Sequence, residues 1–139
     1  MSYKGKKITD GEDRTEAYRD WRHKFGKKRY VVDLDQVEYK IINGNIVPVA
    51  VLELTRADWS PGKSLQDTVL KRIDKQYAQG KALRELSKRI GVDAYIVLFV
   101  KDLSEFHIYN LTRDSGWHVC DQEKYSGFID WLHREKTDD

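Results

Sequence analysis

The 139-residue sequence predicts an α/β domain built around a mixed sheet. Residues 30–42 and 46–56 are rich in Val, Ile and Tyr and flank an Asn-Gly dipeptide, which is typical of a β-hairpin. A long amphipathic stretch with apolar residues at helical spacing follows the hairpin. Residues 94–100 then form a nearly unbroken apolar run, as in a strand that is covered on both faces.

The first helix is expected over residues 13–25, where Ala17 and Trp21 begin an apolar repeat of four residues. The hairpin that follows turns at Asn43-Gly44-Asn45, with the turn centred on the glycine. Pro48 comes early in the second strand and lacks an N–H group, so irregular pairing is expected there.

The amphipathic stretch predicts one long helix over residues 64–90, with Gly80 marking a kink or a close approach to the sheet. Two further strands are expected over residues 105–111 and 117–120. Residues 123–135 close the chain as an amphipathic helix. The predicted order is therefore helix, strand, strand, helix, strand, strand, helix, with an additional short strand before the last helix.

Composition indicates one globular domain over residues 1–139, with residues 1–12 as a flexible polar arm. Hydrophobic residues make up 40% of the chain and charged residues 35%. No apolar run approaches the roughly 20 residues of a membrane-spanning helix, so no membrane partner is expected. The single cysteine, Cys120, excludes an internal disulfide and favours a reducing cytoplasm.

Charge is unevenly distributed although the net charge is only +2. Basic residues outnumber acidic ones in residues 1–29 and 62–90, whereas acids gather around the hairpin and the C-terminal end. Basic segments that flank an acidic cluster suit a protein that holds a polyanion near a metal. The alternative is that charged helices simply face water.

The hairpin carries carboxylates among its valines and isoleucines. A turn centred on Gly44 places Asp35 across from Glu53 and Asp33 across from Thr55. Opposed residues have Cβ atoms about 5 Å apart, and like charges there are destabilising unless something neutralises them. A hard divalent cation such as Mg²⁺ or Mn²⁺ does so, whereas salt bridges to neighbouring lysines and arginines are the alternative.

An aspartate on one strand, followed by hydrophobic residues and a glutamate near the end of the next, resembles the Asp and Glu-x-Lys motif of the PD-(D/E)XK nuclease superfamily. This superfamily includes type II restriction enzymes and archaeal Holliday-junction resolvases. The resemblance covers roughly residues 13–111 and implies a restriction-endonuclease-like mixed central sheet flanked by helices. It also implies metal-dependent hydrolysis of DNA phosphodiester bonds, with DNA as the partner and a homodimer or larger assembly.

The resemblance assigns roles residue by residue. Asp35 matches the motif aspartate, with Asp33 as its alternative, and Glu53 in VAVLELT matches the glutamate. Glu16 matches the acid that many members carry in the first helix, and Gln76 matches a glutamine on the helix after the motif. Two nearby glutamines are alternatives to Gln76, namely Gln66 and Gln79.

The sequence departs from the motif at Thr55, where the superfamily has a lysine that orients the attacking water. Threonine donates a hydrogen bond but carries no charge, so either another cation substitutes or the site is weak. Arg56 is adjacent but is expected on the opposite face of the strand. Lys71 and Lys75 lie one helical turn apart and could reach inward, whereas Lys40 lies at the far end of the first strand.

Nucleic-acid binding is expected from basic side chains that grip phosphates and from one tryptophan that can stack on a base. The tryptophan is Trp59, in the loop after Glu53, and its alternative role is to anchor that loop over the core. The candidate binding residues are Lys27, Lys28, Arg29, Arg56, Trp59 and Lys75.

Three hypotheses follow from the sequence. The first is a metal-dependent deoxyribonuclease of the PD-(D/E)XK type. The second is a catalytically inactive module on the same fold that binds nucleic acid or a protein. The third is an α/β interaction protein whose hairpin acids form only salt bridges.

Overall fold

The computed structural model describes residues 16–25, 34–76 and 78–135, and of Phe25, Lys75, Gln76 and Glu135 it describes the backbone alone. The chain divides into two compact units, residues 1–31 and 32–139. The first unit contains helix α1 (Glu16–Arg22) and a short 3₁₀ turn, η1 (His23–Phe25). The first predicted helix is thus confirmed over its described part, whereas the predicted arm over residues 1–12 lies outside the described residues.

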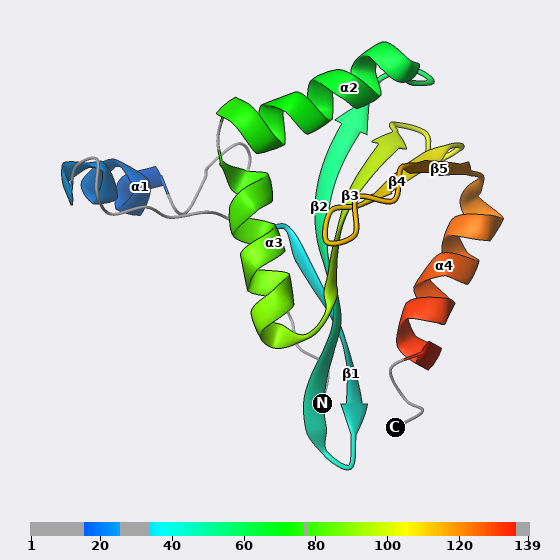
Figure 1. The fold of residues 1–139 in the computed structure, drawn as a ribbon, viewed down its shortest axis with the longest axis horizontal. Coiled ribbons are helices and arrows are strands. Elements are labelled where there is room, and N and C mark those ends of the chain that lie inside the picture. The colour runs from blue at the N-terminus through cyan, green and yellow to red at the C-terminus, as the bar shows by residue number, and fades with distance from the viewer. Residues whose placement is uncertain (1–15, 26–33, 77, 136–139) are drawn as a thin grey trace. The chain divides into compact units, whose positions relative to one another are not determined.

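The second unit is built on a five-stranded mixed sheet (Figure 1). Its strands are β1 (Gln36–Ile42), β2 (Asn45–Ala57), β3 (Asp93–Val100), β4 (Phe106–Asn110) and β5 (Trp117–Cys120). They lie side by side in chain order, and all neighbours are antiparallel except β2 and β3, which are parallel. The predicted mixed α/β class is therefore confirmed.

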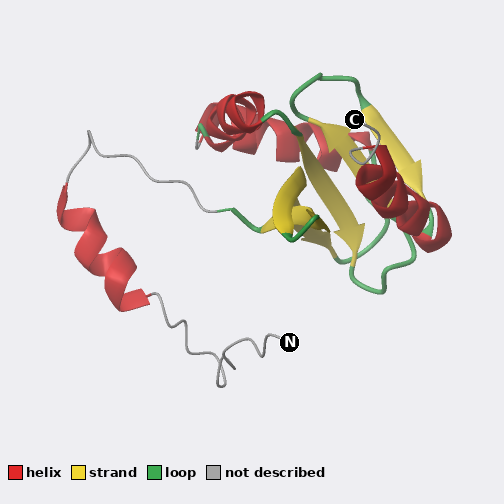
Figure 2. Ribbon diagram, turned by 90° about the horizontal axis from the view of Figure 1, so that it is seen from below, coloured by secondary structure: helices red, strands yellow, loops and turns green. Residues whose placement is uncertain are grey.

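Helices cover both faces of this sheet, as Figure 2 shows. The helices are α2 (Lys63–Lys71), the π turn η2 (Arg72–Gln76), α3 (Gln79–Ile90) and α4 (Gln122–Glu135). Side chains of α2, η2 and α3 pack on one face, including Val69, Ile73 and Leu83. Leu132 of α4 packs on the other face. Strand β3 is buried against both layers, which explains its continuous apolar sequence.

The predicted long helix is in fact two helices, so that expectation was wrong. The chain passes through the π turn after α2, and Ala78 then adopts a left-handed conformation with φ of +54° before α3 begins. Gly80 does not form the kink but lies in the first turn of α3. A Cβ atom on Gly80 would overlap Asp74 Oδ1 and lie 2.9 Å from Ile73 Cγ2. The close approach is therefore to the preceding turn and not to the sheet.

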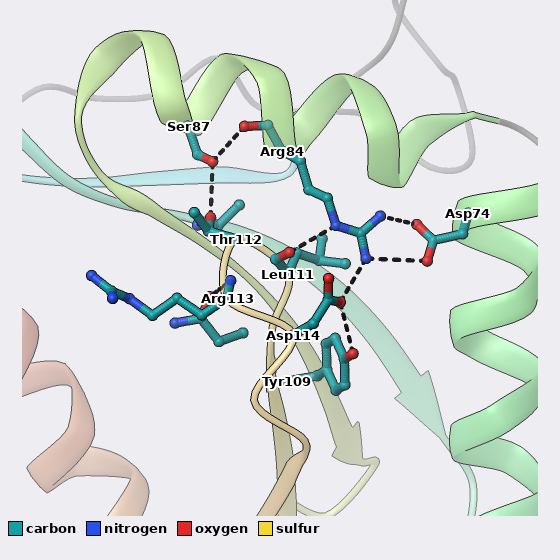
Figure 3. A network of polar contacts seen from close by, with 10 residues as sticks. Asp74, Arg84, Ser87, Tyr109, Leu111, Thr112, Arg113 and Asp114 are labelled. Carbon is teal, nitrogen blue, oxygen red and sulfur yellow. Dashed lines mark hydrogen bonds and ion pairs between the residues drawn. The ribbon is translucent and has the colours of Figure 1, made fainter.

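A polar network centred on Arg84 connects the segment between α2 and α3 to the sheet (Figure 3). The Arg84 guanidinium donates to both oxygens of Asp74, at 2.6 and 3.2 Å, and to Asp114 Oδ1 at 2.8 Å. Its Nε donates to the backbone oxygen of Leu111, and the Tyr109 hydroxyl donates to Asp114. These contacts raise the pKa of Arg84, with the hydrogen bond to Asp74 as the largest cause. Arg84 therefore ties η2 and α3 to the turn after β4.

Gly80→Ala is expected to lower the free energy of unfolding by about 2 kcal/mol, because Asp74 is held by Arg84 and cannot move aside freely. Gly127→Ala in α4 is the matched control, since a Cβ there meets nothing within 4 Å. That change should raise the free energy of unfolding by about 0.5–1 kcal/mol. Urea denaturation of both variants measures the difference, and equal effects would contradict the close approach.

Candidate functional site

The hairpin turn is tighter than the sequence predicted. Ile42 pairs with Asn45, so only Asn43 and Gly44 form the turn. Both have positive φ angles, +52° and +80°, as a type I′ turn requires. The prediction of a turn centred on Gly44 was therefore wrong, because Asn45 is already the first residue of β2.

A β-bulge corrects the register farther along the hairpin. Tyr39 pairs with Pro48, whereas the neighbouring Glu38 pairs with Ala50, so Val49 is an extra residue in β2. The expected irregularity next to Pro48 is confirmed. An extra residue shifts all later pairs by one position along the bulged strand. The bulge thus decides which β2 residues stand across from the start of β1.

The shifted register brings Asp35 to Glu53. Gln36 pairs with Leu52, and the next position in each direction holds Asp35 and Glu53. Asp35 lies just before β1, and its Oδ2 accepts a hydrogen bond of 2.9 Å from the backbone N–H of Leu54. This contact fixes the Asp35 carboxylate beside the Glu53–Leu54 peptide. The apposition that the sequence predicted therefore continues the observed register.

Glu53 and Thr55 point toward the face of the sheet that α2 and α3 cover. Side chains alternate along β2, and Val51 and Ala57 pack into the core on that face. Glu53 is half-buried and its Oε2 atom is buried, whereas Asp35 is exposed. One carboxylate is therefore set into the protein and the other stands at its edge in contact with water.

The donor set fits a hard cation that keeps much of its own water. A carboxylate offers about four lone-pair sites, so Asp35 can hold the Leu54 amide and still bind a cation. Mg²⁺ is typically bound by one or two carboxylates together with waters and substrate phosphates. Within the described ranges, no three His, Cys, Asp or Glu side chains gather into a metal cage. Two carboxylates are compatible with the usual protein contribution to a Mg²⁺ or Mn²⁺ site, whereas a structural zinc ion takes four protein ligands.

The basic residues considered as substitutes for the motif lysine lie in different places. Arg56 is exposed on the opposite face from Thr55 and lies 3.8 Å from Asp58 Oδ1. Lys71 is exposed at the end of α2. Lys40 Nζ donates to the backbone oxygen of His133, at a distance of 2.8 Å.

The remaining sequence candidates belong to the other compact unit or lie outside the described residues. Glu16 is exposed on α1, in the N-terminal unit. The side chains of Gln76 and Lys75 lie outside the described residues. So do four whole residues, namely Lys27, Lys28, Arg29 and Asp33.

A buried polar chain on the same face was missed by the sequence analysis. His107 on β4 is only 3% exposed, and its Nδ1 lies 2.8 Å from Gln66 Nε2 on α2. Its Nε2 lies 3.2 Å from Glu105 Oε2, which also accepts a 2.6 Å hydrogen bond from Ser60 Oγ. Gln66, an alternative to Gln76, thus contacts His107. His107 pairs with Leu98 across the sheet, and Leu98 pairs with Thr55. The partners are remote in sequence, so no local pattern revealed them.

An open cavity of about 480 Å³ lies where β2 ends and α2 begins. Its lining includes Arg56, Trp59, Leu65 and Thr68. Trp59 is 73% exposed, so the alternative of a loop anchor over the core is wrong. An exposed indole beside a cavity is available for stacking against a planar ligand.

Comparisons of the chain with protein-family models, curated proteins and solved structures find no match. None of the described helices is both long and apolar enough to cross a bilayer.

The polar contacts of Glu105 with Ser60 and His107 can be tested by the pH dependence of stability. The hydrogen bond from Ser60, followed by the contact with His107, lowers the pKa of Glu105 below its ordinary value of 4.5. A lowered pKa contributes stability that is complete above pH 4.5 and is lost as the pH falls through the folded-state value. Glu105→Gln should therefore lower the free energy of unfolding at neutral pH, and the deficit should shrink in acid. Urea denaturation across this range measures it, and a deficit independent of pH would contradict the interaction.

Proposed function

We propose that this chain is a metal-dependent nuclease of the PD-(D/E)XK type, with a restriction-endonuclease-like fold, that hydrolyses phosphodiester bonds of DNA. The observation that carries the proposal is the hydrogen bond from the Leu54 amide to Asp35, which holds the Asp35 carboxylate beside the peptide after Glu53, one position beyond the last hairpin pair, Gln36 and Leu52. Like charges in that position repel each other, and a divalent cation held between the two carboxylates would remove the repulsion. The mixed sheet and the helices on both faces are compatible with such a fold.

In the proposed mechanism, two residues would bind the cation and two others would contact the DNA. Asp35 and Glu53 would hold Mg²⁺ or Mn²⁺, with Asp35 oriented by the Leu54 amide and Glu53 by its half-buried position. When bound, the cation would supply an activated water and charge stabilisation at the phosphate. Arg56 and Trp59, at the cavity beyond Ala57, would contact the DNA backbone and an exposed base.

Thr55 limits the activity that we expect from this site. It lies on the face of Glu53 and can donate one hydrogen bond to the attacking water. It lacks the positive charge that stabilises the transition state in the resembled superfamily, and such stabilisation is often the largest catalytic contribution. Arg56 points away from this face and Lys71 is exposed. We therefore expect a slow nuclease.

A second candidate function is a catalytically inactive module on the same fold that binds nucleic acid or a protein. It is favoured by one observation, the neutral Thr55 where the motif requires a lysine. In such a module the Trp59 cavity and the basic residues would bind the partner, and the hairpin acids would be dispensable. Binding that survives Glu53→Ala would distinguish it from the enzyme.

Cleavage of circular, linear and branched DNA in Mg²⁺ or Mn²⁺ tests the proposal. Asp35→Ala and Glu53→Ala should each lower the cleavage rate by about 100-fold or more, because each removes a cation ligand. Glu85→Ala is the matched control, since Glu85 is an exposed acid on α3 and its loss should leave the rate unchanged. Thr55→Lys should raise the rate by about tenfold or more, because it restores the missing charge.

Each result has a defined meaning when circular dichroism shows that the variants are folded. Cleavage that both alanine variants abolish supports the nuclease. DNA binding without cleavage, even in Thr55→Lys, supports the binding module. Cleavage that persists unchanged in Asp35→Ala and Glu53→Ala would overturn the assigned site.

A further inference from the structure

Among the strands that the structure describes, β1 is an edge strand, and its apolar side chains are exposed. It lies at one end of the sheet order, and Figure 1 shows the hairpin extending past the ends of α3 and α4. Val37, Tyr39 and Ile41 are 41%, 50% and 67% exposed, on the side of the sheet that α2 and α3 cover elsewhere. Ile46 on β2 pairs with Ile41 and is 66% exposed. Edges of this kind are templates for pairing with another strand.

The direction of the backbone groups in β1 follows from the turn. A two-residue turn closes on a hydrogen-bonded pair, which here is Ile42 and Asn45. Hydrogen-bonded and non-hydrogen-bonded pairs alternate along an antiparallel ladder, so Lys40 and Glu38 also direct their backbone groups toward β2. The backbone groups of the residues between them therefore point outward from the edge, at Val37, Tyr39 and Ile41.

We propose that two copies of this chain pair through β1, antiparallel, about a two-fold axis at Tyr39. In this register Tyr39 stands across from its copy, and Val37 across from the copy of Ile41. These are the positions with outward backbone groups, so each pair exchanges hydrogen bonds in both directions. Glu38 then stands across from the copy of Lys40, twice, at the non-hydrogen-bonded positions where side chains approach most closely. In this one register the outward backbone groups are hydrogen-bonded, the apolar side chains face each other and the opposite charges are paired.

The neighbouring registers fail on the same criteria. An axis at Glu38 sets this acid against its own copy, and an axis at Lys40 does the same for the lysine, which is destabilising. An axis between two residues turns the apolar face of one copy to the opposite side from that of the other. Among these neighbouring registers, the axis at Tyr39 is the one that pairs Glu38 with Lys40 and keeps the apolar residues of both copies on one face.

The pairing joins two five-stranded sheets into one continuous sheet. A seven-residue strand gives a small interface, so the dimer should depend strongly on protein concentration. Both copies of Asp35 would lie on the same face of the joined sheet, about 26 Å apart along the strand direction. The dimer does not depend on the proposed nuclease activity, since it rests on β1 alone.

Sedimentation velocity over a concentration series of the full chain tests the pairing. Lys40→Glu and Glu38→Lys each set like charges across the axis and should weaken the dimer at least about tenfold. The double variant Glu38→Lys/Lys40→Glu restores opposite charges and should recover dimerisation. Both residues also contact His133 on α4, so thermal unfolding of each variant accompanies the measurement.

Two further substitutions, at the exposed residues Ile41 and Ile46, test the pairing without changing the residues that contact α4. Ile41→Lys should abolish the dimer, because it places a charge across from an apolar residue at the edge. Ile46→Lys is the matched control, since Ile46 is equally exposed on the same face but lies on β2, away from the edge. A chain that stays monomeric at all concentrations overturns the proposal. A dimer that Ile41→Lys and Ile46→Lys weaken equally also overturns it, because such a dimer would form through the exposed sheet faces and not through the β1 edge. Failure of the double variant Glu38→Lys/Lys40→Glu to recover the dimer would overturn it as well.

Discussion

The β-bulge at Val49 is the constraint on which the candidate site depends. The tight Asn43-Gly44 turn by itself would align Asp35 with Leu52, whose side chain packs on the α4 face of the sheet. The extra residue in β2 moves the alignment by one position, and because side chains alternate, that step brings Asp35 to Glu53. The bulge lies beside Pro48, which has no N–H to donate and tolerates a local break in pairing. One irregular residue thus determines which side chain meets the aspartate.

The rest of the unit holds β2 in place around that residue. From Ala50 onward β2 pairs in parallel with β3, which is buried on both faces and offers little freedom to slip. The helices over Glu53 are joined by the π turn, and Arg84 links that turn to the sheet. Glu53 is therefore a half-buried acid in a rigid strand, whereas Asp35 sits at the end of a neighbouring strand. This combination is the one that we propose to bind a cation at the boundary of protein and water.

Local signals in the sequence predicted most of the elements. The bounds of β5 and the double burial of β3 follow from turn residues and apolar spacing, which depend on near neighbours. The sequence prediction placed the hairpin turn one residue off. The bulge shifts the register by one residue in the compensating direction, so the predicted alignment of Asp35 with Glu53 continues the observed ladder. The polar contacts that link Gln66, His107 and Glu105 could not be predicted. Gln66 and His107 are far apart in sequence, and no periodic pattern records such a contact.

The central claim is that Asp35 and Glu53 act together on a divalent cation. A titration of Mn²⁺, followed by the loss of its free electron paramagnetic resonance signal, measures binding without DNA or turnover. Saturable binding is expected, and Asp35→Asn and Glu53→Gln should each weaken it by about tenfold or more, because each neutral replacement removes a charged ligand. Glu85→Gln, which neutralises an exposed acid on α3, should leave binding unchanged. Binding that is absent from the wild type, or that is the same in all variants, would contradict the account.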